Sequence, residues 1–520
     1  MVSEIGPDTP APSSTRSINN FPLRGYQNVS DEYSQSPWAK KTVLSFDGGG
    51  IRGYSSLLIL ENLIAKIKEI ETEISKSEIR SSADYPWMAT NIYTPDTFLP
   101  CHYFDYIAGT STGGLSAIML GRLRMTVEEA LSQYKEFGNA VFGKARWWNE
   151  RSLPPLWFPR AKYASKKARA AFKKIIYNKM VKENRKLFPY HIDTVPFKYR
   201  KDRTRTIVFS FFVNKKTGVS NVPYLWRTYD HEFETGTSDD DYPPLNPSLA
   251  HITPIWQVAR ATSAAPTYFE SIKLGHEKHL DGGMGANNPS LFVLQEIRSK
   301  HGRAPALFLS IGCGKNSNVN QAAPEDDEEF RRTFTVDSGR RKQFLKKWLE
   351  IGRSWKHFMT DTEGHHGVDG WKLECIAMNV QHRCRLNVEG RMRDIPLDDW
   401  DPPTSGEITL NRIRKETVEY LEKPEVQKRI LDMARELVNI RRQRAETERW
   451  EVFASDVTYC CPNDNCRRSH NMRYKTRHHA RQHVTLGCEY DRKTNITDAE
   501  LEHYLNTGRR FPSDNIQDHS

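Results

Sequence analysis

The chain lacks any apolar run of the roughly 20 residues that span a bilayer, although 38% of its 520 residues are hydrophobic. This excludes an integral membrane protein and leaves enough apolar side chains for a substantial core. Residues 1–20 are polar and contain Pro and Ser, so we expect neither a signal peptide nor a membrane anchor. The eight cysteines are scattered. They predict reduced thiols in a cytoplasmic protein and exclude a dense disulfide framework.

A serine between small residues is the first candidate functional residue. Ser111 is the central residue of G-T-S-T-G at 109–113, after the apolar run 104–108 and before the helix-like run 114–120. This pattern is typical of a nucleophile elbow, a sharp strand-to-helix turn that lifts the serine oxygen clear of a sheet. The two flanking glycines let the backbone pass closely without Cβ clashes. A plain turn is the alternative, because a chance G-x-S-x-G is common in a long chain.

Two further glycine clusters favour the elbow. Gly48, Gly49 and Gly50 follow a β-like run and precede a helix-like run at 55–70. Successive glycine amides at the start of a helix point N–H groups at one spot, beside the positive end of the helix dipole. An oxyanion needs that arrangement. In the second cluster, Asp281 ends a short β-like stretch and precedes two glycines.

The order and spacing of these motifs resemble the patatin-like phospholipase family. The chain has D-G-G-G-x-R-G at 47–53, G-T-S-T-G at 109–113 and D-G-G at 281–283, with similar flanking sequence at 259–269 and 287–289. The resemblance spans roughly residues 40–314. It implies a three-layer α/β hydrolase fold and calcium-independent hydrolysis of lipid acyl esters by a Ser/Asp dyad. It also implies the site residues, namely a dyad of Ser111 and Asp281, an oxyanion hole at Gly48, Gly49 and Gly50, and Arg52 beside it.

The same residues can be interpreted from their chemistry alone. A serine that attacks an ester carbonyl needs a base for its proton and preorganised donors for the developing oxyanion. An aspartate with an ordinary pKa of about 4 is a weak base in water. Asp281 must therefore lie close to Ser111 in a water-poor pocket that raises its proton affinity. We expect an acyl-serine intermediate and no cofactor in the chemistry.

Three other interpretations stay open. Gly48–Gly53 also fits the dinucleotide fingerprint G-x-G-x-x-G, although Glu69 and Glu71 fall in a charged, helix-like stretch instead of ending a second strand. Asp281–Gly283 could be only a turn. A histidine could be the base of a triad, and the candidates near Asp281 are His251, His276 and His279.

Composition divides the chain into five parts. We predict, in order, a disordered tail at 1–38, a patatin-like catalytic domain at 39–320, a mainly helical extension packed on the core at 321–452, a possible zinc finger at 456–490 and a polar tail at 491–520. Within the extension we expect a basic helix at 340–359 and a long helical stretch at 408–450 that Pro424 splits in two.

The net charge of +11 is unevenly distributed. Between Lys144 and Lys174, ten basic residues accompany one acidic residue and the aromatics Trp147, Trp148, Trp157 and Phe158. Tryptophans favour the headgroup level of a membrane and lysines attract anionic lipid, so this segment could hold the protein at a membrane surface. The alternative is a substrate-channel wall with buried aromatics and solvated lysines.

A separate pattern lies near the C-terminus. Cys461, Cys466, His479 and His483 have the spacing C-x4-C-x12-H-x3-H, which resembles a two-Cys, two-His zinc finger. The hydrophobic residues usual in that motif are replaced by His470 and Thr476, and alternative ligands are Cys460, His478 and Cys488. An unstructured basic tail is the competing interpretation. Its arginines make nucleic acid and a nuclear location conceivable, but a lone finger reads only about three base pairs, so protein contact or local stabilisation ranks higher.

Together these patterns predict an α/β protein with a helical C-terminal extension and a small zinc-binding module. We expect a cytoplasmic, peripherally membrane-associated lipid acyl hydrolase of phospholipase A type, which cleaves fatty acyl esters of glycerolipids in lipid metabolism. The alternative from another class is a catalytically idle patatin-fold adaptor or a zinc-finger interaction protein.

Overall fold

The computed structural model describes most of the chain, in ranges separated by gaps. These are residues 36–75, 81–84, 97–143, 161–182, 191–214, 218–231, 245–315, 362–363, 367–455, 457–463, 466, 472–488 and 497–510. The predicted tail up to residue 35, the aromatic residues between 147 and 158, and the predicted basic helix at 340–359 lie outside the described residues.

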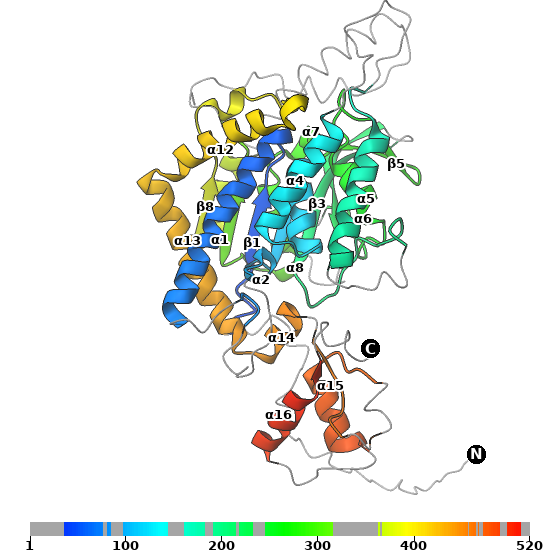
Figure 1. The fold of residues 1–520 in the computed structure, drawn as a ribbon, viewed down its shortest axis with the longest axis vertical. Helices are drawn as coiled ribbons and strands as arrows, with labels where there is room; N and C mark the ends of the chain where they lie inside the picture. The colour runs from blue at the N-terminus through cyan, green and yellow to red at the C-terminus, as the bar shows by residue number, and fades with distance from the viewer. Residues whose placement is uncertain are drawn as a thin grey trace, which may run out of the picture.

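One mixed, mainly parallel sheet forms the centre of the molecule (Figure 1). In the described part of the chain it has eight strands in the order β5-β6-β3-β2-β1-β7-β8, and β4 pairs with β3. The strands are β1 Thr42–Phe46, β2 Tyr106–Thr110, β3 Arg205–Asn214, β4 Gly218–Arg227, β5 Ile272–Leu274, β6 Glu277–Asp281, β7 Leu307–Ile311 and β8 His382–Leu386. Strands β1, β2, β3, β7 and β8 run parallel, whereas β4 and β6 run antiparallel to β3.

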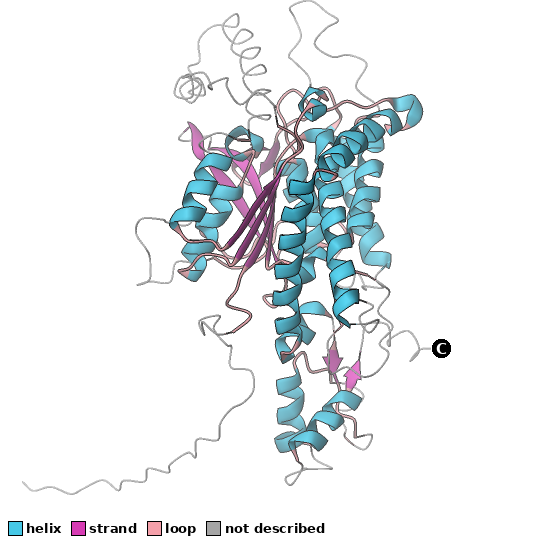
Figure 2. Cartoon of the chain, turned by 90° about the vertical axis from the view of Figure 1, so that its left-hand side faces the viewer, coloured by secondary structure: helices cyan, strands magenta, loops and turns pink. Residues whose placement is uncertain are grey.

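Helices cover both faces of the sheet, which gives three layers (Figure 2). One face packs against α1 Gly53–Ser75, α3 Thr112–Ala117, α4 Val127–Val141, α5 Ser165–Lys182, α6 Ile255–Thr262, α12 Glu407–Leu421 and α13 Pro424–Ala445. The other packs against α8 Ser290–His301 and α11 Val368–Ala377. Two short helices, α2 Pro100–Tyr103 and α7 Gly283–Ala286, lie at the ends of strands.

Strand β1 shows why the sequence forms this core. All five of its residues are buried. Val43 contacts one helical layer, whereas Leu44 and Phe46 contact the other. A parallel strand covered on both faces is expected to be a nearly continuous apolar run, as this one is.

The predicted boundary at residue 320 differs from the structure, because the central sheet continues beyond it. β8 pairs in parallel with β7, and its Cys384 and Leu386 are buried. The sequence H-R-C-R-L does not look like a buried strand, since three of its five residues are basic. Arg385 is accommodated by a buried carboxylate, described below.

The helical part of the extension matches the prediction. Pro424 is the first residue of α13, and two residues separate it from Leu421, where α12 ends. Proline is tolerated there because the first helical N–H has no partner within the helix. α13 packs on α1, where Arg442 donates to the buried carboxylate of Glu71 at 2.7 Å.

The C-terminal residues form a small module of their own. It contains β9 Thr458–Tyr459, α15 Arg477–Gln482, a π-helical turn at His483–Gly487, α16 Asp498–Thr507 and β10 Arg509–Arg510, which pairs with β9. Figure 1 shows this module beyond α14 Glu448–Ala454, at the end of the molecule away from α12. Among the described helices, none combines the length and the apolar content needed to cross a membrane.

Candidate active site

Hydrogen-bond register brings the two candidate dyad residues together. Strand β4 occupies one edge of β3, so β2 and β6 share the other edge. Thr110 at the end of β2 pairs with Phe209, and Asp281 at the end of β6 pairs with Ser210, the next residue of β3. Because β2 is parallel and β6 antiparallel to β3, their C-terminal ends meet there. Ser111 therefore follows β2 directly into contact with Asp281.

The strand-to-helix turn at Ser111 is strained. Ser111 has a φ of 53°, in the left-handed region that residues with a side chain rarely adopt. A Cβ atom on Gly109 would lie 2.1 Å from the carbonyl oxygen of Gly113, so a side chain there would collide with the backbone. Thr262 Oγ1 accepts the Ser111 N–H at 2.8 Å and donates to the Phe209 carbonyl at 2.6 Å. Thr262 thus fixes the turn to the sheet.

Ser111 and Asp281 are directly hydrogen bonded and buried. Ser111 Oγ donates to Asp281 Oδ2 at 2.7 Å, and the Gly283 N–H donates to Asp281 Oδ1 at 2.8 Å. Burial raises the pKa of Asp281 from 3.8 to about 7, and the two hydrogen bonds oppose this increase. A carboxylate with a pKa near neutrality is a far better proton acceptor than an exposed one.

The glycine loop offers two free amides instead of the predicted three. The Gly48 N–H donates to the Asn287 carbonyl at 2.9 Å, so Gly48 is not an available donor. Only glycine fits at position 48, since a Cβ there would lie 2.3 Å from Asn287 Oδ1. Within the described residues, the N–H groups of Gly49 and Gly50 donate to no other group. Tyr134 holds this loop by donating to the Gly50 carbonyl at 2.5 Å.

Arg52 lies behind the loop and does not line the pocket. It is 2% exposed, and its Nη1 donates to the Arg393 carbonyl at 3.3 Å. The N–H of Ile51, the residue before Arg52, donates to the Leu397 carbonyl at 2.8 Å. Arg52 and Ile51 therefore position the segment around Leu397, which lines the pocket described below.

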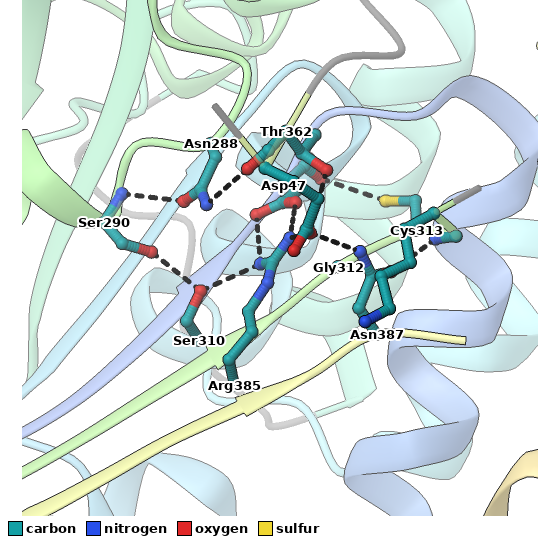
Figure 3. A network of polar contacts seen from close by, with 12 residues as sticks. Asp47, Asn288, Ser290, Ser310, Gly312, Cys313, Thr362, Arg385 and Asn387 are labelled. Atoms are coloured by element: carbon teal, nitrogen blue, oxygen red, sulfur yellow. Dashed lines mark hydrogen bonds and ion pairs between the residues drawn. The ribbon is translucent and has the colours of Figure 1, made fainter. Parts of the chain in front are cut away.

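A buried polar network fixes the residue that precedes the glycine loop (Figure 3). Asp47, fully buried at the end of β1, accepts two hydrogen bonds from Arg385 of β8, at 2.8 and 2.5 Å. Arg385 also donates to Glu363 at 2.8 Å and to Ser310 at 2.9 Å. Burial raises the pKa of Asp47 to about 6, and the charge of Arg385 opposes this increase. Asp47 is thus mainly ionised at neutral pH, and its contacts anchor the loop.

Ser111 and Asp281 line a pocket together with Gly50, Leu397 and Tyr268. A second, apolar chamber shares the lining residues Leu115 and Phe137 with this pocket. It extends between helices that include α4, α5 and α6, and its other walls include Met119, Phe172, Ile175, Ile176 and Ile255. Apolar side chains thus line the space beside the serine.

The candidate histidines do not contact Ser111. His251 accepts the Arg227 N–H at 3.1 Å, and burial lowers its pKa to about 4. The buried His279 lies 3.2 Å from Ser210 Oγ within a group of aromatic rings, and burial lowers its pKa to about 4 as well. His276 is exposed in a turn. Since the hydroxyl of Ser111 donates to Asp281, the structure does not assemble a triad.

The dinucleotide interpretation and the simple-turn interpretation also disagree with the structure. Glu69 and Glu71 lie within α1, and neither ends a strand. Asp281 is the last residue of β6 and is fully buried.

The described part of the basic aromatic segment is α5, which has two different faces. Its apolar side chains Phe172, Ile175 and Ile176 line the chamber. Lys166 and Lys167 are exposed, whereas Lys173 and Lys174 form ion pairs with Asp193 and Glu136. The buried face of α5 thus matches the channel-wall interpretation, and its exposed basic face is compatible with a membrane surface.

The predicted zinc ligands are only partly brought together. Cys461, Cys466 and His483 converge, but their fourth neighbour is Cys488. His479, predicted as a ligand, is exposed at the start of α15 and hydrogen bonds to Thr476 at 2.8 Å. The capping geometry of the first turn therefore directs His479 away from the cluster.

Several residues that shape the site were missed in the sequence. Thr262 lies in the flanking sequence at 259–269, so its position was visible there but its role was not. Tyr134 and Arg385 carry no local signal, because they act through contacts 84 and 338 residues away in the chain.

Fold and site together define an α/β protein in which a strained elbow serine meets a buried aspartate beside a glycine loop. Comparison with known families identifies the domain, since residues 44–293 match the family described as patatin-like phospholipase. The chain therefore carries a patatin-like phospholipase domain.

Known relatives agree with this assignment. The chain is 26% identical over 279 residues to calcium-independent phospholipase A2-gamma of Homo sapiens, covering 52% of this chain and 28% of that protein. It is 26% identical over 292 residues to phospholipase A I of Arabidopsis thaliana, covering 51% and 20%. It is 27% identical over 272 residues to patatin-like protein 4 of the same plant, covering 50% and 52%. The chain thus spans about half or less of the length of these relatives. Among solved structures, VipD from Legionella pneumophila aligns with 10% identity and a TM-score of 0.35, over 74% of this chain and 67% of that one.

Proposed function

We propose that the protein is a lipid acyl hydrolase of phospholipase A type, with Ser111 as nucleophile and Asp281 as base. The observation that carries this proposal is the 2.7 Å hydrogen bond from Ser111 Oγ to a buried carboxylate whose pKa is raised to about 7. The domain assignment and the relatives named as phospholipases support the same reaction.

The chemistry proceeds in two steps. Asp281 takes the Ser111 proton as Oγ attacks the acyl carbonyl carbon, and the carbonyl oxygen becomes an oxyanion held by the N–H groups of Gly49 and Gly50. The C–O bond of the ester then breaks, and the leaving alkoxide takes the proton from Asp281. In the second step, Asp281 takes a proton from water, hydroxide adds to the acyl-serine, and Ser111 leaves with that proton. Fatty acid and free enzyme are the products.

The apolar chamber favours a long acyl chain as the group that is transferred. It begins at Leu115, only four residues after Ser111 on the elbow helix. Burying each methylene there is worth about 0.8 kcal/mol, so a fatty acyl chain gains far more than a short ester. Glycerolipid esters are the proposed substrate class.

We further propose that the protein works at a membrane surface and binds it peripherally. The exposed Lys166 and Lys167 on α5 lie on the helix whose opposite face lines the chamber. Contact with anionic lipid at this face would hold the helix that lines the chamber at the membrane surface. The exposed cationic face is the observation that supports this location.

The proposed division of the chain differs from the predicted one. Residues 36–455 would act as one catalytic unit, because β8 and the segment around Leu397 complete the sheet and the pocket. Residues 457–510 would form a separate module with a structural metal, argued below. The proposed ester chemistry uses groups of the chain itself.

The test is a lipid panel combined with active-site labelling. Wild-type protein should release fatty acid from defined glycerolipids, and a fluorophosphonate should label Ser111. Ser111→Ala should lose at least about a thousandfold in rate. Ser116→Ala is the matched control, because Ser116 is buried on the same helix α3 and donates within it to Thr112 at 3.3 Å. Undiminished hydrolysis in Ser111→Ala would refute the assignment. Absence of hydrolysis by wild type over the whole panel would favour the idle adaptor.

A further inference from the structure

The C-terminal module contains a cluster of soft metal ligands that does not follow the expected finger spacing. Cys461, Cys466, His483 and Cys488 are all buried, and one ligand atom from each lies within 4.8 Å of the others. Their spacing is C-x4-C-x16-H-x4-C. Three of the four donors are thiols, and all eight cysteines of the chain are free of disulfide bonds.

The distances within the cluster fit one tetrahedral ion. Sulfur at about 2.3 Å and nitrogen at about 2.0 Å from a tetrahedral zinc place two sulfurs about 3.8 Å apart, and a sulfur and a nitrogen about 3.5 Å apart. Cys461 Sγ and Cys488 Sγ are separated by 3.9 Å, and Cys466 Sγ and His483 Nε2 by 3.5 Å. A disulfide would require two sulfurs at about 2.05 Å.

The local fold explains why Cys488 replaces His479. Thr476 caps α15 by accepting the His479 N–H at 3.3 Å, and its hydroxyl also lies 2.8 Å from the ring nitrogen of His479. His483 begins the π-helical turn and stacks on Tyr474 with ring centroids 5.1 Å apart. The chain leaves that turn at Cys488, which faces back to Cys461.

The module is too small to be held by its apolar core alone. That core consists of seven buried side chains, Val457, Tyr459, Tyr474, Ala480, Val484, Leu501 and Leu505. Small units of this kind generally need a metal, disulfides or a neighbouring surface to fold.

Ion pairs connect the module to Glu448 and Glu451 of α14, and Glu448 pairs with Arg481 at 2.8 Å. Glu451 is fully buried, and its carboxylate pairs with Arg509 at 2.6 Å and Arg477 at 3.8 Å, and accepts from the hydroxyl of Tyr459. Arg477 and Arg481 also bind Glu502, so these two arginines serve contacts within the protein.

We propose that Cys461, Cys466, His483 and Cys488 bind one structural zinc ion, which closes the C-terminal module on α14. Zinc fits best because thiolate and imidazole are its preferred ligands in closed, four-coordinate sites. This proposal does not depend on the proposed hydrolase activity.

Two matched pairs of variants test the ligand set in the full-length protein, expressed with zinc in the medium and purified under reducing conditions. His479→Ala and Cys460→Ser should keep about one zinc per chain, because these residues neighbour the cluster without joining it. His483→Ala and Cys488→Ser should lose at least about nine-tenths of the zinc. His483→Cys should restore it, since a fourth thiolate suits zinc equally well. Fluorophosphonate labelling of Ser111 provides a control for an intact catalytic unit.

Cobalt substitution gives a second readout for variants that fold poorly. The charge-transfer intensity from thiolate to Co²⁺ in wild type should correspond to three thiolates, and in His483→Cys to four. Wild-type protein with little zinc, or with iron in its place, would overturn the proposal. So would loss of zinc in His479→Ala together with its retention in Cys488→Ser, because that result would restore the two-Cys, two-His finger. A Cys461–Cys488 disulfide under these conditions would also overturn it.

Discussion

Replacement of Asp281 by asparagine should make the protein more stable at neutral pH while it abolishes hydrolysis. The ionised carboxylate is buried with two hydrogen bonds but without a cationic partner among the groups that shift its pKa. Asparagine has nearly the same shape and no charge, so the substitution removes the free-energy cost of burying an unpaired charge. The proposed base and the destabilising group are thus the same residue, as is common at strained active sites.

The pH dependence follows from the raised pKa. Between 3.8, the ordinary value, and about 7, the folded protein holds a proton on Asp281 that the unfolded chain has released. In that range the unfolding free energy of wild type falls with rising pH, by about 1.4 kcal/mol per unit from this group. The stabilisation is complete below the unfolded pKa and is lost as pH rises through about 7. The stability advantage of Asp281→Asn should therefore grow by roughly 2 kcal/mol between pH 5 and pH 7 and level off above pH 8.

Urea unfolding of wild type and Asp281→Asn from pH 5 to pH 8.5 measures the difference between their unfolding free energies. The titration of all other groups is the same in both proteins and cancels in this difference. Asp432→Asn, on the exposed face of α13, is the control for removal of a surface carboxylate. In parallel, kcat/KM of wild type should fall about tenfold per pH unit below pH 7, because attack requires ionised Asp281. A difference between Asp281→Asn and wild type that stays constant within about 0.5 kcal/mol over this range would refute the reasoning.

Three further perturbations probe the loop, the chamber and the membrane face. Arg385→Leu should destabilise the protein by about 3–5 kcal/mol, because it leaves the buried Asp47 without its partner. The double variant Asp47→Asn/Arg385→Leu should recover stability but not kcat. Recovery of both, in urea unfolding and in rate assays, would contradict a role of this ion pair in positioning the glycine loop. Met119→Trp should lower kcat/KM on long-chain esters relative to short ones by roughly tenfold, since the indole fills the chamber; equal loss across a chain-length series would place the acyl chain elsewhere. Lys166→Gln/Lys167→Gln should weaken binding to anionic vesicles by up to about tenfold at low salt and leave the rate of hydrolysis of a soluble ester unchanged. Equal loss of activity on vesicle lipid and on the soluble ester would argue that these lysines support the chamber wall instead.

The sequence predicts those features of the fold and the site that are determined within one segment of the chain, and it misses those that depend on contacts between distant segments. β1 and β2 were predictable because each is a buried apolar run that ends in a glycine motif. The contact between Ser111 and Asp281 was expected from the motifs, but its cause, the pairing of β2 and β6 with successive residues of β3, involves three distant segments. Sequence gave no indication that the Gly48 amide is used by Asn287, because that hydrogen bond depends on how two loops approach each other.

Charge and helix geometry explain the other differences. β8 was missed because its arginines hide a strand whose alternate residues are buried, and Arg385 is stable there only with Asp47 as partner. The sequence favours His479 over Cys488 because the spacing of His479 and His483 matches a two-Cys, two-His finger. A threonine cap and a π-helical turn change which side chains meet.

The position of β1 between β2 and β7 determines where the catalytic unit can be cut. A fragment limited to residues 44–293 would end before β7 and β8. The edge of β1 that pairs with β7 would then be an open template for other chains, and Asp47 would lose Arg385. Such a fragment should aggregate during expression, and deletion analysis that stops at the matched region would report loss of activity for reasons unrelated to the chemistry. The same holds during synthesis on the ribosome, since Ser111 and Asp281 are made before β7 and β8, the strands that complete the sheet.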